Sequence, residues 1–239
     1  MPAETDPRSL SAPDAVLWDL DGTLLDSEKL WDIPLYELTE KLGGQLSTAT
    51  RQAMVGTNVM VTLRLLYAEV GIPEPTAEQV ADGAAWIDRR MAEVFRQDLP
   101  WRPGAAAALA TVRAAGLPMA LVTSTERGLT EIALDTIGRH LFDVTVCGDE
   151  VDGKNKPLPE PYLKASRMLD VDPTRCVAIE DSPTGVSSAV AAGCTVLVVP
   201  CEVDVEQGER RVFRTSLEGL TVADLTMLIE QAADLDGRP

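Results

Sequence analysis

Two aspartates separated by one residue stand near the start of the chain, directly after an apolar run and directly before a glycine, as Asp19-Leu20-Asp21-Gly22. Two crowded carboxylates repel each other, and burying them without a partner costs free energy. A divalent cation is one partner that would offset this cost. The alternative is an exposed polar turn, because Asp-Gly is a common turn dipeptide.

Three further polar segments follow apolar runs later in the chain. Ser124 lies in a run of hydroxyl side chains, Lys156 precedes a proline, and Glu180 stands next to Asp181. Each has an ordinary alternative, because Ser124 or Thr125 could cap one helix and Asp181 or Ser182 another, and Lys156 could be a solvated counter-charge. The conjunction favours chemistry at one sheet edge: carboxylate oxygens suit Mg²⁺, and hydroxyl and ammonium groups suit phosphoryl oxygens.

Five short, almost continuously apolar runs predict strands that are covered on both faces. They are Ala15–Asp19, Met119–Thr123, Val144–Cys147, Cys176–Glu180 and Thr195–Val199. Helical stretches alternate with these runs at Ala105–Ala115, Arg127–Ile137, Pro159–Leu169 and Thr184–Ala192, and a last helix is expected at Val222–Ala233. This alternation predicts an α/β fold, with a Rossmann-like parallel sheet as its core and helices on both faces.

The segment 27–102 breaks this rhythm, because it holds no strand-like run. Apolar residues there recur at helical spacing and predict a cap of about four helices. An insertion at this point would lie above the carboxyl edge of the sheet, where open α/β folds bind ligands. The predicted division is a flexible tail at 1–13, a catalytic core made of 14–26 and 103–239, and the cap at 27–102.

The chain is acidic, since 21 basic and 38 acidic side chains give a net charge of −17. Such a surface repels phosphate backbones and anionic lipid, so we expect neither nucleic acid nor membrane as a partner. The chain shows no apolar signal segment and no run of about 20 apolar residues, so we expect a cytoplasmic protein, and a monomer. One histidine, His140, and four cysteines without a C-x-x-C pair disfavour a zinc site.

At its polar segments the sequence resembles the haloacid dehalogenase-like (HAD) superfamily. It is most similar to the branch with a helical cap after the first motif, which includes phosphoglycolate phosphatase and β-phosphoglucomutase-like phosphatases. The resemblance rests on D-L-D-G-T-L-L-D-S-E from Asp19, T-S-T around Ser124, K-P-L-P-E-P-Y from Lys156 and E-D-S-P-T-G from Glu180, in family order. It implies a Rossmann-like core and a mobile cap.

The resemblance also implies a role for each matching residue. Asp19 would be the nucleophile, and Asp21 would be the general acid and base. Ser124, which follows Thr123, would bind the phosphate of the substrate. Lys156 would balance the charge of Asp19 and of the phosphoryl group.

The implied cofactor is Mg²⁺, and the implied ligands come from two segments. Asp19 would bind the ion through its side chain and Asp21 through its backbone carbonyl. Asp181 would complete the site, with Glu180 as a further ligand or as a partner of one.

A polar break between helical stretches of the cap, Gly56-Thr57-Asn58, is a candidate for contact with the substrate, as is Arg51 before it. An ordinary loop between helices is the alternative. Trp31 is a further candidate for the cleft, although core packing is its commoner use.

Three functions remain open. The first is a Mg²⁺-dependent phosphatase that hydrolyses a small phosphate monoester, such as a sugar, polyol or nucleotide phosphate, through an aspartyl-phosphate. The second is a β-phosphoglucomutase-like sugar-phosphate mutase, which is disfavoured because Trp31 stands where related mutases carry a histidine. The third is a non-enzymatic α/β binding module. A dehalogenase is disfavoured because that branch lacks the second acid of the first motif, here Asp21.

Overall fold

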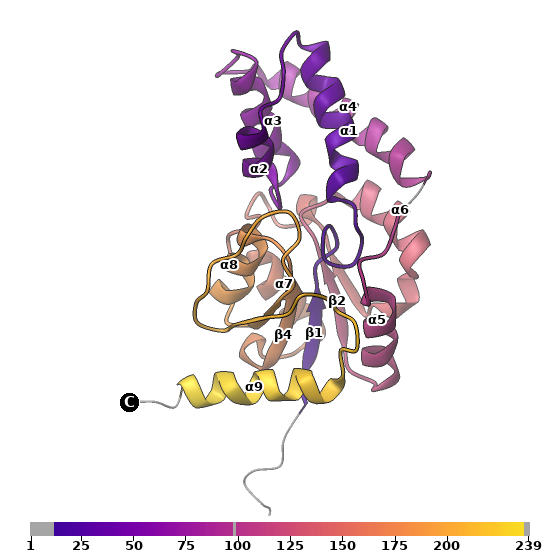
Figure 1. Ribbon diagram of the computed structural model, residues 1–239, viewed down its shortest axis with the longest axis vertical. Coiled ribbons are helices and arrows are strands. Elements are labelled where there is room, and N and C mark those ends of the chain that lie inside the picture. Colours follow the sequence, from indigo (N-terminus) through magenta and orange to yellow (C-terminus); the bar gives the residue numbers. More distant parts are fainter. Residues whose placement is uncertain (1–11, 98, 237–239) are drawn as a thin grey trace, which may run out of the picture.

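A sheet of six parallel strands forms the centre of the protein, in the order β3-β2-β1-β4-β5-β6 (Figure 1). The computed structural model describes residues 12–97 and 99–236, so most of the predicted tail lies outside the described residues. The strands are β1 (Ala15–Trp18), β2 (Met119–Val122), β3 (Val144–Val146), β4 (Cys176–Glu180), β5 (Thr195–Val198) and β6 (Arg211–Phe213). The predicted α/β class is confirmed. Five strands begin at the predicted residues, and β6 is an edge strand that was not predicted.

Alternate residues of the central strand serve two separate apolar cores. Val16 and Trp18 of β1 pack in the core that also holds side chains of α5 (Ala105–Ala114), α6 (Arg127–Ile137) and α9 (Val222–Asp236). Ala15 and Leu17 face the opposite core, under α7 (Glu160–Leu169) and α8 (Pro183–Ala191). All four are fully buried. Burying a side chain such as Val or Leu stabilises the fold by about 1.5–3 kcal/mol, so an apolar strand is held firmly between two helical layers.

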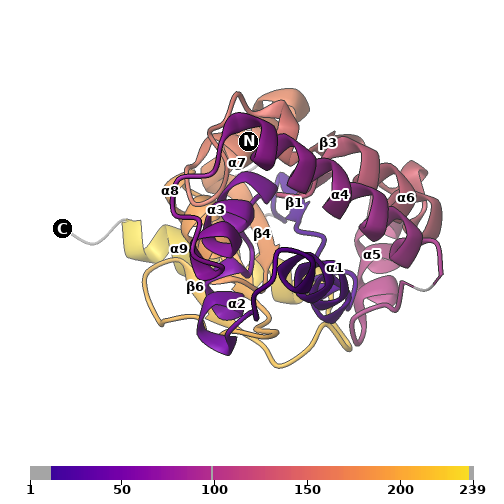
Figure 2. The same ribbon diagram turned by 90° about the horizontal axis from the view of Figure 1, so that it is seen from above.

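Four helices are inserted between β1 and α5, as the helical spacing predicted. They are α1 (Glu28–Lys41), α2 (Thr48–Met54), α3 (Val59–Glu69) and α4 (Ala77–Phe95). They lie together at one end of the molecule (Figure 1), and the view from above shows them over the sheet (Figure 2). Helix α3 packs against both α2 and α4, and α1 packs against α4. In the part of the chain that the structure describes, no helix combines the length and the apolar character needed to cross a membrane.

The two connections of this insertion run side by side. The backbone N–H of Asp26 donates to the carbonyl of Pro100 at 2.7 Å, and that of Arg102 donates to the carbonyl of Leu24 at 2.9 Å. The Arg102 guanidinium also pairs with the Asp26 carboxylate at 3.4 Å. Because α4 packs against α6 as well, the insertion is held over the carboxyl ends of the strands.

Candidate active site

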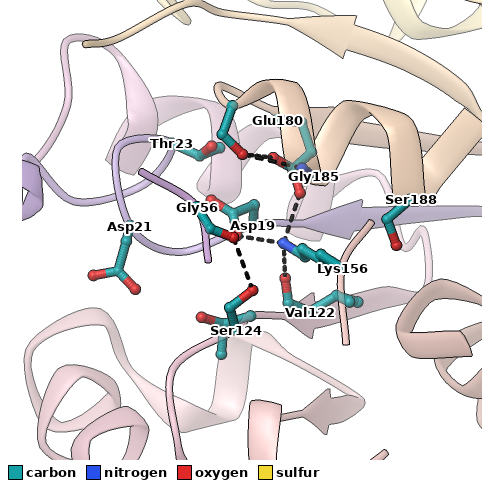
Figure 3. A network of polar contacts seen from close by, with 12 residues as sticks. Asp19, Asp21, Thr23, Gly56, Val122, Ser124, Lys156, Glu180, Gly185 and Ser188 are labelled. Carbon is teal, nitrogen blue, oxygen red and sulfur yellow. Dashed lines mark hydrogen bonds and ion pairs between the residues drawn. The ribbon is translucent and has the colours of Figure 1, made fainter. Parts of the chain in front are cut away.

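The carboxyl ends of neighbouring strands bring distant polar residues to one level. Trp18 of β1 lies beside Leu121 of β2 and beside Ile179 of β4 in the sheet register. Asp19, which follows β1, and Glu180, the last residue of β4, therefore lie next to each other, although they are far apart in the sequence. Figure 3 shows their side chains gathered beside each other at this edge.

Lys156 reaches this point from the loop between β3 and α7. Its Nζ donates to Asp19 Oδ1 at 2.7 Å, to Glu180 Oε1 at 2.6 Å and to the carbonyl of Val122 at 3.0 Å. The lysine side chain is almost completely buried. Burial alone would lower the pKa of Lys156, but the charges of Asp19 and Glu180 outweigh burial and raise the pKa. The ammonium is therefore charged and fixed between two carboxylates.

Three buried carboxylates form what we call the acidic cluster: Asp19, Glu180 and Asp181. Each offers an oxygen within 4.8 Å of the others. Burial and the charge of Glu180 together raise the pKa of Asp19 to about 8, although the charge and the hydrogen bond of Lys156 oppose this rise. The Lys156 ammonium contacts two of the three acids, so the cluster holds an excess of acidic groups over cationic ones. Oxygen donors at this separation suit a hard divalent cation, which would offset that excess.

Glu180 is held in place from two sides. Tyr162 Oη donates to Glu180 Oε1 at 2.5 Å, and Lys156 Nζ lies 5.3 Å from the centre of the Tyr162 ring. On the other side, Gly185 in the first turn of α8 makes room, because a Cβ there would lie 2.0 Å from Glu180 Oε2. Sequence reasoning assigned neither residue a role, although both lie within the segments that carried the family resemblance.

Asp21 points away from the acidic cluster (Figure 3). Its Oδ1 accepts hydrogen bonds from Ser27 Oγ at 2.6 Å and from Trp31 Nε1 at 3.2 Å, and its Oδ2 accepts one from Thr125 Oγ1 at 2.6 Å. Ser27 occupies the N-cap of α1 but makes no side-chain cap bond, because its hydroxyl serves Asp21 instead. The Asp21 carboxylate is therefore separate from the acidic cluster. If Asp21 contacts a cation, it would do so through its backbone carbonyl, as the family resemblance implies.

The predicted hydroxyls lie beside the acids. Ser124 Oγ donates to the backbone carbonyl of Gly56 at 3.3 Å, and Thr123 Oγ1 accepts from the N–H of Thr125 at 3.0 Å. The structure does not use Ser124 as a helix cap, because α6 begins at Arg127 and its N-cap residue is Glu126, with no side-chain cap bond. For the last segment, Ser182 does cap α8, accepting from the N–H of Gly185.

The cap loop closes a cavity over these groups. Gly56 and Thr57 line the cavity together with Asp19, Asp21, Thr123, Ser124 and Lys156. Asn58 is not among the lining residues, because its side chain accepts from two backbone N–H groups and caps α3. Arg51 lines the cavity and pairs with Asp32 at 2.5 Å. The candidate Trp31 lines the cavity and also packs edge-on against Phe95.

Two further acids line the same cavity and were not anticipated. Asp88 comes from α4 of the insertion, and Glu126 stands at the start of α6. Asp88 lies within a helix whose apolar periodicity marks Ile87 and Met91 as core, so its acid looks like part of a solvated face. No feature of the sequence singles out either acid.

The match to known proteins extends over most of the chain. Residues 13–193 match haloacid dehalogenase-like hydrolases. The chain belongs to the haloacid dehalogenase-like hydrolase family. The matched range includes all four polar segments and the inserted helices, so the family assignment covers the cavity as well as the sheet.

Several curated relatives match with similar strength. Hexitol phosphatase A of Escherichia coli (strain K12) is 31% identical over 214 residues, which cover 86% of this chain and 92% of the relative. Protein CbbY of Cereibacter sphaeroides is 33% identical over 196 residues, which cover 78% of this chain and 84% of the relative. With these relatives, the chain is placed among the phosphoric monoester hydrolases of the family.

Solved structures agree on the architecture. CbbY from Rhodobacter sphaeroides in complex with phosphate has a TM-score of 0.74 at 27% identity, covering 89% of this chain and 99% of that chain. The β-phosphoglucomutase of Clostridium difficile has a TM-score of 0.82 at 19% identity, covering 93% and 99%. The second likeness establishes the fold with its helical cap and carries no statement about activity.

Proposed function

We propose that this protein is a Mg²⁺-dependent phosphatase that hydrolyses a small phosphate monoester through an aspartyl-phosphate on Asp19. One observation carries the proposal: the Asp19 carboxylate faces the cavity, contacts Lys156 at 2.7 Å and belongs to the acidic cluster. A nucleophilic carboxylate, an ammonium and a cation-binding set of oxygens thus meet at one point. This is the combination that phosphoryl transfer to a carboxylate requires.

The first chemical step forms the Asp19–phosphorus bond and breaks the bond between phosphorus and the leaving oxygen. Lys156 keeps its proton and balances the charge of the phosphoryl group. Ser124 Oγ donates to a phosphoryl oxygen in place of the carbonyl of Gly56, which it contacts now. The Asp21 carboxyl gives its proton to the leaving alkoxide.

The second step returns the enzyme to its starting state. The Asp21 carboxylate takes a proton from water, whose oxygen then attacks phosphorus and releases the Asp19 carboxylate and phosphate. The separation of Asp21 from the acidic cluster suits this exchange, because its proton is not shared with Lys156. The hydroxyls of Ser27 and Thr125 keep the Asp21 side chain turned toward the cavity.

The acidic cluster is the proposed site of the Mg²⁺ ion. Asp19 and Asp181 would hold it through their carboxylates, and Asp21 through its backbone carbonyl. Glu180 already accepts from Lys156 and Tyr162 through the same oxygen, Oε1, which favours its role as a partner that positions the lysine. When bound, Mg²⁺ supplies positive charge that lets an anionic phosphate approach an anionic nucleophile.

Asp19→Asn tests the nucleophile. We expect no measurable release of phosphate from p-nitrophenyl phosphate, with an unchanged circular dichroism spectrum. Asp135→Asn, an exposed change in α6 with the same loss of charge, is the matched control and keeps wild-type turnover. Undiminished hydrolysis by Asp19→Asn would contradict the assignment.

Thermal unfolding tests the cation site without relying on activity. Mg²⁺ that binds only the folded state raises Tm by mass action. We expect this rise for the wild type and its loss in Asp181→Asn. An equal rise in both proteins would place the ion elsewhere.

A mutase remains a less favoured candidate. Trp31 donates from Nε1 to Asp21 and occupies the position where related mutases carry a histidine, so the residue associated with that chemistry is absent. Conversion of β-glucose 1-phosphate to glucose 6-phosphate with little free phosphate would select the mutase.

A further inference from the structure

Two carboxylates stand on the part of the cavity wall that is contributed by the insertion and the start of α6. Asp88 and Glu126 line the cavity that also holds Asp19 and Lys156, and both are half-buried. They belong to elements that pack against each other, because α4 contacts α6. The proposed mechanism uses neither acid.

The two acids share one electrostatic environment. Burial raises the pKa of Asp88, and the nearby charge of Asp149 raises it further against a smaller lowering by Arg89. Burial also raises the pKa of Glu126, with further rises from Asp88 and Asp149. Asp88, Glu126 and Asp149 therefore lie close enough for their charges to act on one another.

The cavity offers little positive charge to balance these acids. Among the described lining residues, the cationic side chains are Lys156 and Arg51. Lys156 is engaged by Asp19 and Glu180, and Arg51 is paired with Asp32. The wall that would face the leaving group is therefore negative overall.

We propose that Asp88 and Glu126 determine which leaving group the cavity accepts. They admit a polyhydroxyl leaving group that carries no acidic group, and they exclude one that carries a carboxylate or a second phosphate. The inference rests on the proposed phosphatase function. Hydroxyl groups donate hydrogen bonds to half-buried carboxylates and so offset their loss of solvation. An anionic leaving group would instead meet like charges in a partly buried site, where repulsion is stronger than in bulk water.

The rest of the wall fits an uncharged leaving group. Leu35, Ile87 and Leu129 supply apolar surface, and Thr57 and Thr62 supply hydroxyls that hydrogen-bond each other at 2.9 Å. A polyol presents both carbon–hydrogen surface and hydroxyls. The CbbY structure in complex with xylulose-(1,5)bisphosphate contains a doubly phosphorylated sugar, which is the class that this wall is expected to reject.

Matched substrate pairs test the inference. Sorbitol 6-phosphate and 6-phosphogluconate differ in a terminal hydroxymethyl against a carboxylate, and so do glycerol 3-phosphate and 3-phosphoglycerate. We expect kcat/KM to favour the neutral member of each pair by on the order of tenfold or more at low salt, and the ratio to shrink as salt screens the repulsion. Equal kcat/KM within both pairs would overturn the inference.

Variants assign the selectivity to the two acids. Asp88→Asn and Glu126→Gln each keep the shape and remove one charge, and we expect each to reduce the neutral-to-acidic ratio several-fold. Asp82→Asn is the matched control, because this exposed change on the same helix also removes one negative charge but lies away from the cavity, and it should keep the wild-type ratio. An unchanged ratio in both cavity variants would overturn the assignment.

Two further results separate the inference from the proposed function. A tenfold preference for glucosamine 6-phosphate over glucose 6-phosphate would overturn recognition by hydroxyls, because an ammonium would then be the preferred partner. Absence of hydrolysis of every ester, including p-nitrophenyl phosphate with Mg²⁺, would overturn the proposed phosphatase itself. Hydrolysis without discrimination between the pair members overturns the inference alone.

Discussion

Gly185→Ala is the most direct structural test of the acidic cluster. Gly185 lies in the first turn of α8, and a Cβ built on it would lie 2.0 Å from Glu180 Oε2 and 2.1 Å from Glu180 Cδ. Such distances force a displacement. Glu180 has no solvent into which it could turn, because it is fully buried and its Oε1 accepts from Lys156 and Tyr162. The methyl group must therefore move the carboxylate or shift the start of α8.

The expected loss follows from three contributions. Overpacking costs about 1–3 kcal/mol, and weakening the hydrogen bonds of a charged acceptor costs about 1.5–3 kcal/mol. Alanine is favoured over glycine in a helix by about 1 kcal/mol, which opposes these costs. We expect a net loss of about 1.5–5 kcal/mol in the free energy of unfolding, measured by urea titration, and a fall of kcat/KM by about 100-fold or more, because Lys156 loses a fixed partner.

Gly128→Ala provides the matched control. Gly128 also lies near the start of a helix, α6, but a Cβ there meets no atom within 4 Å. This variant should be unchanged or more stable by up to about 1 kcal/mol, with unchanged turnover. Equal stability and activity of the two glycine variants would refute the reasoning about Glu180.

A double-mutant cycle identifies the clash itself. Glu180→Asp shortens the side chain by one methylene and withdraws its carboxylate from Gly185. The cost of Gly185→Ala should then be smaller in the Glu180→Asp background by about 1 kcal/mol or more, because residues in contact are not additive. Strict additivity would show that the alanine acts through another contact.

Three further changes probe the neighbours of the nucleophile. Lys156→Met leaves the acidic cluster without its ammonium, so we expect it to destabilise the metal-free protein by about 3–5 kcal/mol and the protein in Mg²⁺ by less. Urea titrations in EDTA and in Mg²⁺ measure the two losses, and equal losses would contradict this prediction. Tyr162→Phe keeps the ring but removes the hydroxyl that donates to Glu180. We expect the free energy of unfolding to fall by about 1.5–3 kcal/mol and the apparent affinity for Mg²⁺ to fall as well. Wild-type values of both quantities would contradict this prediction. Trp31→Phe removes one hydrogen-bond donor to Asp21. We expect it to lower kcat more than it changes KM and to alter the pH–rate profile. If Trp31 served only for packing, the pH–rate profile would stay unchanged.

Much of the core could be predicted from the sequence, because its signals are local. The first five strands are short, mostly apolar runs, and in β1, β2, β4 and β5 every residue is buried, so their first residues were predicted correctly. β6, at Arg211–Phe213, is short, only half-buried and at the edge of the sheet, so it lacks the longer apolar run that marks the other strands. Helix α7 begins at Glu160 and not at the predicted Pro159, a shift of one residue at a helix end.

Only part of the candidate site could be predicted from the sequence, because some of its residues are brought together only by the packing of helices. Asp19, Lys156 and Asp181 follow strands or adjoin prolines, so type and position together mark them. Asp88 carries no such mark, because its meaning depends on how α4 packs against α6. Asn58 shows that one polar residue can suit two roles: the sequence made it a candidate for substrate contact, and in the structure its side chain caps α3.

The chain has a net charge of −17, and acidic side chains gather at two places in the cavity. At the strand ends, the three acids of the acidic cluster lie close together and the Lys156 ammonium contacts two of them, so an anionic phosphate is expected to need added positive charge, which a divalent cation would supply. At the cap side, Asp88 and Glu126 line the same cavity, and the other cationic side chain among its described lining residues, Arg51, is paired with Asp32. A monoester with an uncharged leaving group suits both ends of the cavity, because its phosphate would lie at the cation site and its uncharged part would lie beside Asp88 and Glu126. A bisphosphate suits only the first, so selectivity for the leaving group follows from where the positive charge is placed.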